Sequence, residues 1–186
     1  FLCNQFYAWT NKLVPNKFPS LEGDHPRMVI PFRNSDGEIF AYQGRAFGNE
    51  KPKYITIVLD ESVPKIFGLD RVDTSRDIFI VEGPIDSLFI PNCIAVAQSD
   101  MRVPQYKDKA VLVPDNEPRN REVTKQIEKA IDEGYRIVIW PDYVRQKDIN
   151  DMILSGMDAS EIMEIIHNNT LQGLSAKVAF QTWKKI

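Results

Sequence analysis

The residues Ile78–Ile90, IFIVEGPIDSLFI, give the clearest indication of the fold of this chain. Its first four residues are apolar and partly β-branched, a pattern that predicts a short buried strand. Gly83 permits a tight turn after the strand, and Pro84 suits the first position of a helix. Glu82 therefore stands at the carboxyl end of a central strand, where open α/β sheets place their ligands. Asp86 follows in the first turn of the expected helix, so two carboxylates near one strand end predict a cation site.

The same pattern recurs twice further along the chain. Ala110–Val113 indicates a second buried strand, which leads to Asp115 and Glu117, and Arg136–Trp140 indicates a third, which leads to Asp142. Because parallel strands bring their carboxyl ends to one edge of a sheet, we expect these acids to converge. Clustered carboxylates repel one another unless a cation compensates, and hard oxygen ligands suit Mg²⁺ or Mn²⁺. A helix cap or a solvent-exposed group explains each acid equally well by itself, but three strand ends in this order favour a shared site.

These features resemble the TOPRIM family, which occurs in primases, topoisomerases and some nucleases. In that family a strand leads into Glu-Gly, and a later strand ends in Asp-x-Asp. Glu82-Gly83 matches the first part, and Asp115-x-Glu117 matches the second with Glu in place of Asp, which lengthens one ligand arm by a methylene. Asp86 matches an acid that primases carry four residues after the Glu.

The third acidic motif of primases resembles Asp142 together with the cluster Lys147–Asp151, KDIND. The resemblance thus implies catalytic roles for Glu82, Asp115 and Glu117. It implies a metal site drawn from Glu82, Asp86, Asp115, Glu117 and Asp142. Whether Glu82 is a metal ligand or acts partly as a general base stays open.

A β-rich segment precedes this region. Met28–Phe32 and Glu38–Phe47 flank an Asp-Gly turn, which predicts a hairpin, and Tyr54–Val58 predicts a third strand. Gly44, inside the second strand, marks a bulge or a close approach of the backbone. The segment from Arg27 to Lys53 contains five basic residues and three acidic ones. A strand face exposed to solvent would be enough to explain this excess of basic residues.

The segment RMVIPFRNSDGEIFAYQGRAFGNEKPKY, residues 27–54, resembles the subdomain that precedes TOPRIM in bacterial and phage primases. The resemblance extends from Arg27 to Asp151, and the Pro-Ile-Asp-Ser wording after Gly83 is most like primases of T-even-type phages. It implies that nucleic acid or nucleotide is contacted by Arg33, Arg45, Lys53 and Lys147.

Two further segments carry polar residues for which the sequence allows both a structural and a functional role. Arg119 and Arg121 lie at the start of a predicted helix, 119–133, where the helix dipole disfavours cations. Pairing with Asp115 or Glu117 explains them, and so does a nucleotide phosphate. The polar loop Gln98-Ser99-Asp100 follows a short apolar strand, and structural and functional roles are equally supported there.

We therefore expect an α/β fold: a TOPRIM domain with a central, mostly parallel sheet flanked by helices, preceded by a small mixed α+β subdomain with an antiparallel hairpin. The expected boundaries are 1–75 for the basic-hairpin subdomain, 76–155 for the TOPRIM domain and 156–186 for carboxyl-terminal helices.

Composition sets the outer bounds. The chain has 186 residues, 43% hydrophobic and 26% charged, with a net charge of −3, so it is no bulk polycation. Cys3, Cys93, His25 and His167 lack the spacing of a zinc site or a disulfide framework. No apolar run is long enough for a membrane span. We expect a cytoplasmic location, that of a bacterial host if the gene is carried by a phage.

The resemblance implies a DNA primase core, a nucleotidyltransferase that makes short RNA primers on single-stranded DNA from ribonucleoside triphosphates, with a replicative helicase as partner. A TOPRIM nuclease or topoisomerase-like enzyme, and a non-catalytic nucleic-acid-binding TOPRIM domain, are the alternatives. The hairpin favours a primase over a nuclease, no tyrosine has the context of a topoisomerase nucleophile, and the intact acids disfavour a non-catalytic domain. Primases of this family carry an amino-terminal zinc module; since the chain starts at Phe1 rather than Met, we expect that module upstream.

Overall fold

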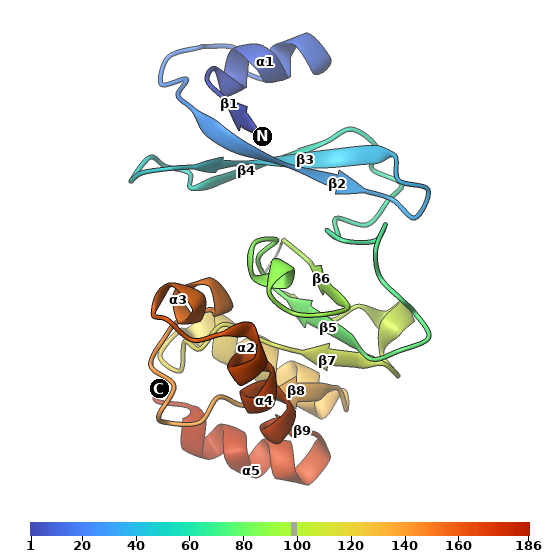
Figure 1. Cartoon of the computed structure of the whole chain (residues 1–186), viewed down its shortest axis with the longest axis vertical. Coiled ribbons are helices and arrows are strands. Elements are labelled where there is room, and N and C mark those ends of the chain that lie inside the picture. The colour runs from blue at the N-terminus through green and yellow to red at the C-terminus, as the bar shows by residue number, and fades with distance from the viewer. Residues whose placement is uncertain (98–99) are drawn as a thin grey trace. The chain divides into compact units, whose positions relative to one another are not determined.

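The computed structural model describes residues 1–97 and 100–186 and divides the chain into two compact units, Phe1–Asp70 and Arg71–Ile186 (Figure 1). Gln98 and Ser99 of the predicted polar loop lie outside the described residues. Residues 156–186, expected as a separate set of helices, belong to the same compact unit as the strands before them.

The first unit is built on a four-stranded antiparallel sheet in the order β1-β2-β3-β4. Gly37 has a φ of 82°, the left-handed conformation that the turn between β2 and β3 requires, which confirms the predicted hairpin. The helix α1, Phe6–Leu13, belongs to the same unit. The strands are β1 Leu2–Cys3, β2 Arg27–Arg33, β3 Ile39–Ala46 and β4 Tyr54–Val58.

Phe6 of α1 anchors the core of this unit. Its ring is fully buried and lies so close to Gly44 that a Cβ on Gly44 would be 2.4 Å from it. Gly44 is therefore a point of close backbone approach, whereas the irregularity in the β2–β3 pairing falls between Phe32 and Arg33. Cys3, Val29, Tyr42 and Ile57 complete the buried cluster, which fixes α1 against the sheet.

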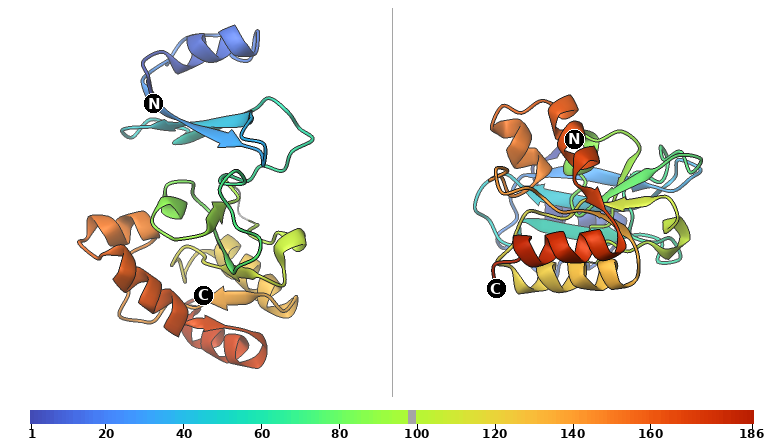
Figure 2. Two further views of the ribbon diagram at one scale, coloured as in Figure 1. Left: turned by 45° about the vertical axis from the view of Figure 1, so that its right-hand side comes forward. Right: turned by 90° about the horizontal axis from the view of Figure 1, so that it is seen from below.

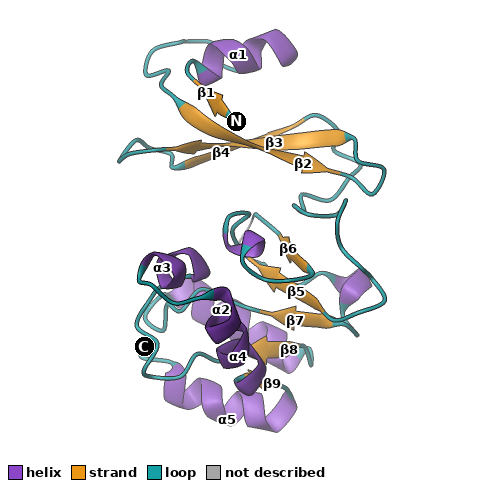
Figure 3. Cartoon of the chain, in the orientation of Figure 1, coloured by secondary structure: helices purple, strands orange, loops and turns teal. Residues whose placement is uncertain are grey.

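The second unit contains a five-stranded sheet in the order β6-β5-β7-β8-β9 (Figure 3). The first four strands are parallel and β9 is antiparallel to β8, so the predicted mostly parallel sheet is confirmed. All four residues of β5 are buried, as expected for the central strand of a sheet covered on both faces. The strands are β5 Ile78–Val81, β6 Cys93–Ala95, β7 Ala110–Leu112, β8 Arg136–Val138 and β9 Thr170–Leu171.

Four α-helices complete the second unit. The helix α2 connects β7 to β8 and packs against α5 and β8, while α3 packs on α4 (Figure 2). Asn120 caps α2, since its side-chain oxygen accepts hydrogen bonds from the Glu122 and Val123 N–H groups. In the part of the chain that is described, no helix is long and apolar enough to cross a membrane. The helices are α2 Arg121–Asp132, α3 Ile149–Leu154, α4 Ala159–Asn168 and α5 Gly173–Trp183.

The prediction of an α-helix after Gly83 is wrong. The structure has a single turn of 3-10 helix, η1, at Asp86–Leu88, and the side chain of Leu88 is exposed. Pro91 and the start of β6 at Cys93 follow so closely that no room remains for a second turn. A second 3-10 turn, η2, lies at Pro104–Tyr106.

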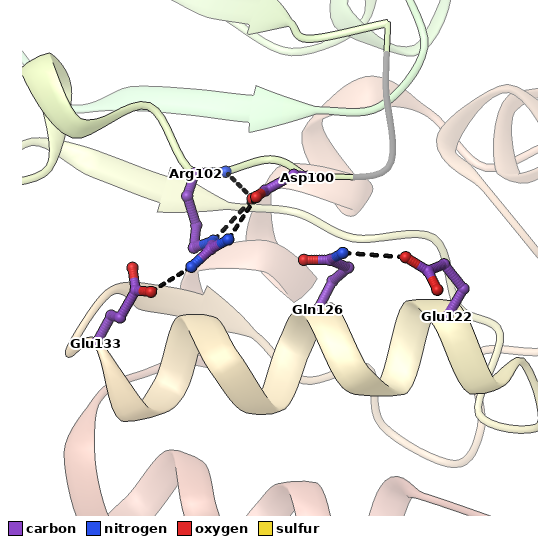
Figure 4. Close-up of polar contacts among 5 residues, drawn as sticks. All are labelled: Asp100, Arg102, Glu122, Gln126 and Glu133. Carbon is purple, nitrogen blue, oxygen red and sulfur yellow. Dashed lines mark hydrogen bonds and ion pairs between the residues drawn. The ribbon is translucent and has the colours of Figure 1, made fainter.

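Arg102 fixes the segment before η2 to the end of α2. Its Nε donates to Asp100 across 2.7 Å, and its terminal nitrogens form ion pairs with Asp100 and Glu133 (Figure 4). On the same helix, Gln126 donates a hydrogen bond to Glu122 across 3.0 Å. The ion pair between Arg102 and Glu133 holds α2 in place at its carboxyl end, whereas the Gln126–Glu122 bond lies within the helix.

Candidate active site

Glu82 lies directly after β5, at the carboxyl end of the central strand. Burial raises the pKa of its carboxyl to about 7, and the nearby carboxylates of Asp115 and Glu117 add to the rise. The Asp115 backbone N–H and Lys147 act in the opposite direction without cancelling it. The convergence of strand ends predicts such a buried carboxyl close to two other carboxylates. Carboxyl groups with a strongly raised pKa occur at functional sites more often than at structural ones.

Asp115 and Glu117 follow β7, and both carboxylates approach the ammonium group of Lys147. Lys147 Nζ lies 3.4 Å from Asp115 Oδ2 and 3.6 Å from Glu117 Oε2. Burial raises the pKa of Asp115 to about 6, although Lys147 pulls it down. Burial alone would lower the pKa of Lys147, but the two carboxylates raise it overall. Lys147 therefore supplies one positive charge where several negative charges gather.

Asp86 joins this edge of the sheet from η1. Its Oδ1 accepts a hydrogen bond of 2.8 Å from the backbone N–H of Asn150, at the start of α3. A Cβ on Gly83 would lie 2.3 Å from Asp86 Oδ2, so the Glu-Gly pair leaves space for this carboxylate. Burial raises the pKa of Asp86, and the neighbouring charge of Asp148 contributes.

Asp142 has no interaction with these acids among the described contacts. Its side chain is 73% exposed, and its nearest described ion-pair partner is Lys185, at 3.9 Å. Asp148 takes the expected place instead, because its charge raises the pKa values of both Asp86 and Asp115. The signal for Asp148 was present in the KDIND cluster, but strand-end position alone pointed to Asp142. We therefore leave Asp142 out of the site and add Asp148 to it.

The acids fit a divalent cation by their chemistry. Within residues 1–97 and 100–186, no three His, Cys, Asp or Glu side chains are already arranged as a metal-binding group. Yet Glu82, Asp115 and Glu117 offer hard oxygen donors and are partly or largely buried, and repulsion from Asp115 and Glu117 adds to the effect of burial in raising the pKa of Glu82. A divalent cation would remove that repulsion, and oxygen donors of this kind suit Mg²⁺ or Mn²⁺.

Asn116, between the two acids, was not singled out by the sequence. Its side-chain Nδ2 donates to the backbone oxygens of Val144 and Gln146, across 2.9 and 3.2 Å. Its backbone N–H donates to the backbone oxygen of Lys147 across 2.6 Å. Hydrogen bonds thus join the loop that carries Asp115 and Glu117 to the loop that carries Lys147.

In the first unit, Arg45 and Lys53 share one aromatic ring. The Arg45 guanidinium lies 5.9 Å, and Lys53 Nζ 5.7 Å, from the centre of the Tyr54 ring. Arg45 and Tyr54 are direct partners across β3 and β4. Two cations over an aromatic ring at the end of a hairpin form a surface suited to phosphates and bases.

Other basic residues of the hairpin serve the fold. Arg33 Nη1 donates to the backbone oxygen of Gly37 across 2.6 Å and so braces the turn. Arg27 is fully buried, and its guanidinium donates to the backbone oxygens of Gly44 and Pro52 across 3.1 and 3.0 Å. Arg27 is therefore unavailable to an external phosphate, and the local excess of basic residues counted from the sequence overstates the surface charge.

Arg119 and Arg121 show no ion pair with Asp115 or Glu117 among the described residues, where Lys147 fills that role. Arg119 instead lines a cavity beside Trp140 and Trp183. The described contacts therefore do not include the predicted pairing of Arg119 with Asp115 or Glu117.

Comparisons with known proteins place this geometry in context. No family model matches the chain. The DNA primase of Enterobacteria phage T4 is 41% identical over 181 residues, which covers 95% of this chain and 52% of that protein. The chain thus spans about half the length of this relative.

Solved structures share the fold. The RNA polymerase domain of Mycobacterium tuberculosis primase DnaG matches with a TM-score of 0.62 at 17% identity, covering 88% of this chain and 67% of that one. A DnaG primase catalytic domain bound to single-stranded DNA matches with a TM-score of 0.58 at 16% identity, covering 77% and 52%. The chain therefore has the fold of primase catalytic cores, with an antiparallel sheet in its first unit and a mostly parallel sheet in its second.

Proposed function

We infer that this chain is the catalytic core of a DNA primase. Nearly the whole length of the chain is homologous to a phage DNA primase, and the chain has the fold of primase catalytic cores. In this role it joins ribonucleotides into short RNA primers on single-stranded DNA during replication. The observation that carries the proposal is the meeting of Glu82, Asp115 and Glu117 at the carboxyl ends of β5 and β7, around Lys147.

The acids would hold Mg²⁺ or Mn²⁺. When bound, such ions lower the charge on the transferring phosphoryl group and favour ionisation of the attacking hydroxyl. Glu82, Asp115 and Glu117 are the proposed ligands, and Asp86 and Asp148 support them through their charge. Asp86 also fixes the start of α3 through the Asn150 N–H.

Lys147 has two roles in this proposal. Its ammonium holds Asp115 and Glu117 together while no other cation is bound. With half of its side chain exposed, at 51%, it is also accessible to a nucleotide phosphate. Arg45 and Lys53, over the Tyr54 ring, are the proposed contacts to nucleic acid in the first unit, and Arg33 is a weaker candidate because it braces its own turn.

The substrates follow from the reaction. A related DnaG catalytic domain has been solved with single-stranded DNA, which supports a single-stranded DNA template here. Ribonucleoside triphosphates are the proposed second substrate, and a replicative helicase is the proposed partner.

The test is an assay with single-stranded DNA, labelled ribonucleotides and either Mg²⁺ or Mn²⁺, in the presence and absence of a supplied primer. We expect template-dependent extension that stops when EDTA removes the cation. Cleavage of the DNA without synthesis would identify a nuclease instead, and DNA binding with neither reaction would identify a non-catalytic domain.

A further inference from the structure

The cavity beside Trp140 and Trp183 lies in the unit that carries the acids. It has a volume of about 280 Å³ and is bounded by the loop after β7, the loop after β8 and the end of α5. Its lining includes three basic side chains, Arg119, Arg145 and Lys185, together with Asp142 and the rings of Trp140 and Trp183. None of Glu82, Asp115, Glu117 and Lys147 lines it.

The charges of this cavity are not balanced internally. Three cations face one carboxylate, in a chain whose net charge is −3. Lys185 is the best neutralised of the three, since its Nζ lies 3.9 Å from Asp142 and donates to the backbone oxygen of Thr182. In the described part of the chain, the guanidinium groups of Arg119 and Arg145 have no hydrogen-bond or ion-pair partner.

The position of Arg119 adds to this imbalance. It immediately precedes Asn120, the cap of α2, so it stands at the positive end of a twelve-residue helix. Arg145, from a different loop, lines the same cavity. Cations that repel one another at a helix amino terminus cost free energy unless an anion joins them.

Hydrogen bonds hold the two tryptophan rings that line the cavity in place. Trp183 Nε1 donates to Asn116 Oδ1 across 3.0 Å, and Trp140 Nε1 donates to the backbone oxygen of Pro114 across 2.7 Å. Both rings are at least 95% buried. The exposed residues Arg119 and Arg145 therefore line the same cavity as two tryptophan rings that hydrogen bonds hold in place, which suits a ligand of defined shape.

We propose that this cavity binds phosphate groups, held by the guanidinium groups of Arg119 and Arg145 with support from Lys185. Guanidinium groups match phosphate oxygens in geometry and keep their charge at all relevant pH values. The volume is at the low end for small-molecule sites, so it suits phosphoryl groups rather than an entire nucleotide. The phosphates belong either to a nucleic-acid strand or to a free nucleotide, and this choice of source is the only step that rests on the proposed function.

The three tryptophans of the chain provide the test. In a ¹⁵N-labelled sample with EDTA, the indole N–H signals of Trp140 and Trp183 report on the cavity, and Trp9, in α1 of the other unit, is an internal reference. The probes are inorganic tripolyphosphate, ATP and a single-stranded oligodeoxynucleotide. We expect tripolyphosphate to shift the two cavity signals.

The double variant Arg119→Gln/Arg145→Gln should weaken tripolyphosphate binding by about tenfold or more. The control Lys125→Gln/Lys129→Gln removes the same charge from exposed positions of α2 and should change it by less than about twofold. Shifts with ATP but not with the oligonucleotide would assign the site to free nucleotides, and shifts with the oligonucleotide would assign it to a strand.

The proposal is overturned if no probe moves the Trp140 and Trp183 signals, or if the arginine variant responds as the wild-type protein does. Because the titration is done without metal and without synthesis, either result would leave the primer-synthesis proposal untouched. Conversely, a chain that binds tripolyphosphate here but makes no primer would retain the phosphate site and lose the proposed function.

Discussion

The indole Nε1–H of Trp183 donates a hydrogen bond to the side-chain oxygen of Asn116 across 3.0 Å, although the two residues are 67 positions apart. Asn116 stands between Asp115 and Glu117 and is bonded through its amide nitrogen to Val144 and Gln146. The helix α5 thereby holds the loop whose acids form the proposed active site. Asn116 is a positioning residue in this arrangement, since its side chain is hydrogen-bonded to Val144, Gln146 and Trp183.

We expect Asn116→Ala to lower the free energy of unfolding by about 1–3 kcal/mol, because it leaves two backbone oxygens and the Trp183 N–H without their partner. Trp183→Phe removes the same hydrogen bond, worth about 1 kcal/mol, and leaves a small cavity beside a buried ring, so its total cost should also be about 1–3 kcal/mol. Urea unfolding of both single variants and the double variant measures their coupling. Asn168→Ala, at an exposed site in α4, is the control and should change stability by under about 0.5 kcal/mol. Purely additive effects of the two changes would contradict a direct interaction.

Glu82→Gln preserves the size of the side chain and removes its charge, so we expect the loss of primer extension in an intact fold. Extension of a supplied primer on single-stranded DNA with Mg²⁺ measures the effect, and circular dichroism checks the fold. Glu128→Gln, exposed on α2, is the matched control and should retain activity. Full extension by the Glu82 variant would remove Glu82 from the catalytic set.

The raised pKa of Glu82 also predicts a pH dependence of stability. Its folded-state pKa of about 7 lies above the ordinary value of 4.5, so the folded state binds the proton more tightly than the unfolded state. This contribution is complete below about pH 4.5 and is lost as the pH rises through 7, and it amounts to about 3 kcal/mol at most. Urea unfolding in EDTA between pH 5 and 8 measures it.

We expect Glu82→Gln to be relatively more stable than the wild-type protein at pH 8 than at pH 5, because Gln does not ionise. A difference between the two proteins that does not change with pH would show that the pKa of Glu82 is not raised. Added Mg²⁺ should stabilise the wild-type protein more at pH 8 than at pH 5, since a cation competes with the proton for the carboxylates.

Lys147→Met removes the ammonium group that lies between Asp115 and Glu117. The Lys147 charge lowers the pKa values of Asp115 and Glu82, so without it both carboxyls should ionise at higher pH. We expect metal-free stability at pH 8 to fall by about 1 kcal/mol, a modest amount because half of the lysine is exposed to solvent, and the loss to shrink at pH 5. Lys125→Met is the control, and an equal loss at both pH values would argue for lost packing instead.

Arg45→Ala/Lys53→Ala removes the two cations over the Tyr54 ring. If both touch phosphates, the logarithmic salt dependence of single-stranded DNA affinity should flatten by about 0.7 for each lost contact. Fluorescence anisotropy over a range of salt concentrations measures the slope. Lys12→Ala/Lys17→Ala removes two exposed charges from the same unit and should leave the slope unchanged. An unaltered slope in the Arg45 and Lys53 variant would return this surface to an ordinary solvated strand face.

Sequence patterns alone were enough to predict the strands β5, β7 and β8, the hairpin of β2 and β3, and the acids that follow the strands. Apolar runs, glycine turns and the residues next to them act over a few positions, so these features are local. The same local information placed Glu82, Asp115 and Glu117 at one edge, because parallel strands share their direction.

Which charged side chains meet depends instead on the packing of distant segments. Asp148 rather than Asp142 joins the acids, Lys147 rather than Arg119 pairs with them, and Arg27 is buried inside its own sheet. Each of these outcomes depends on the path of a loop and on contacts between segments far apart in the chain, as the bond from Trp183 to Asn116 illustrates. Side-chain direction in such loops is set by packing and hydrogen bonding across the fold, and no pattern within a few residues encodes it.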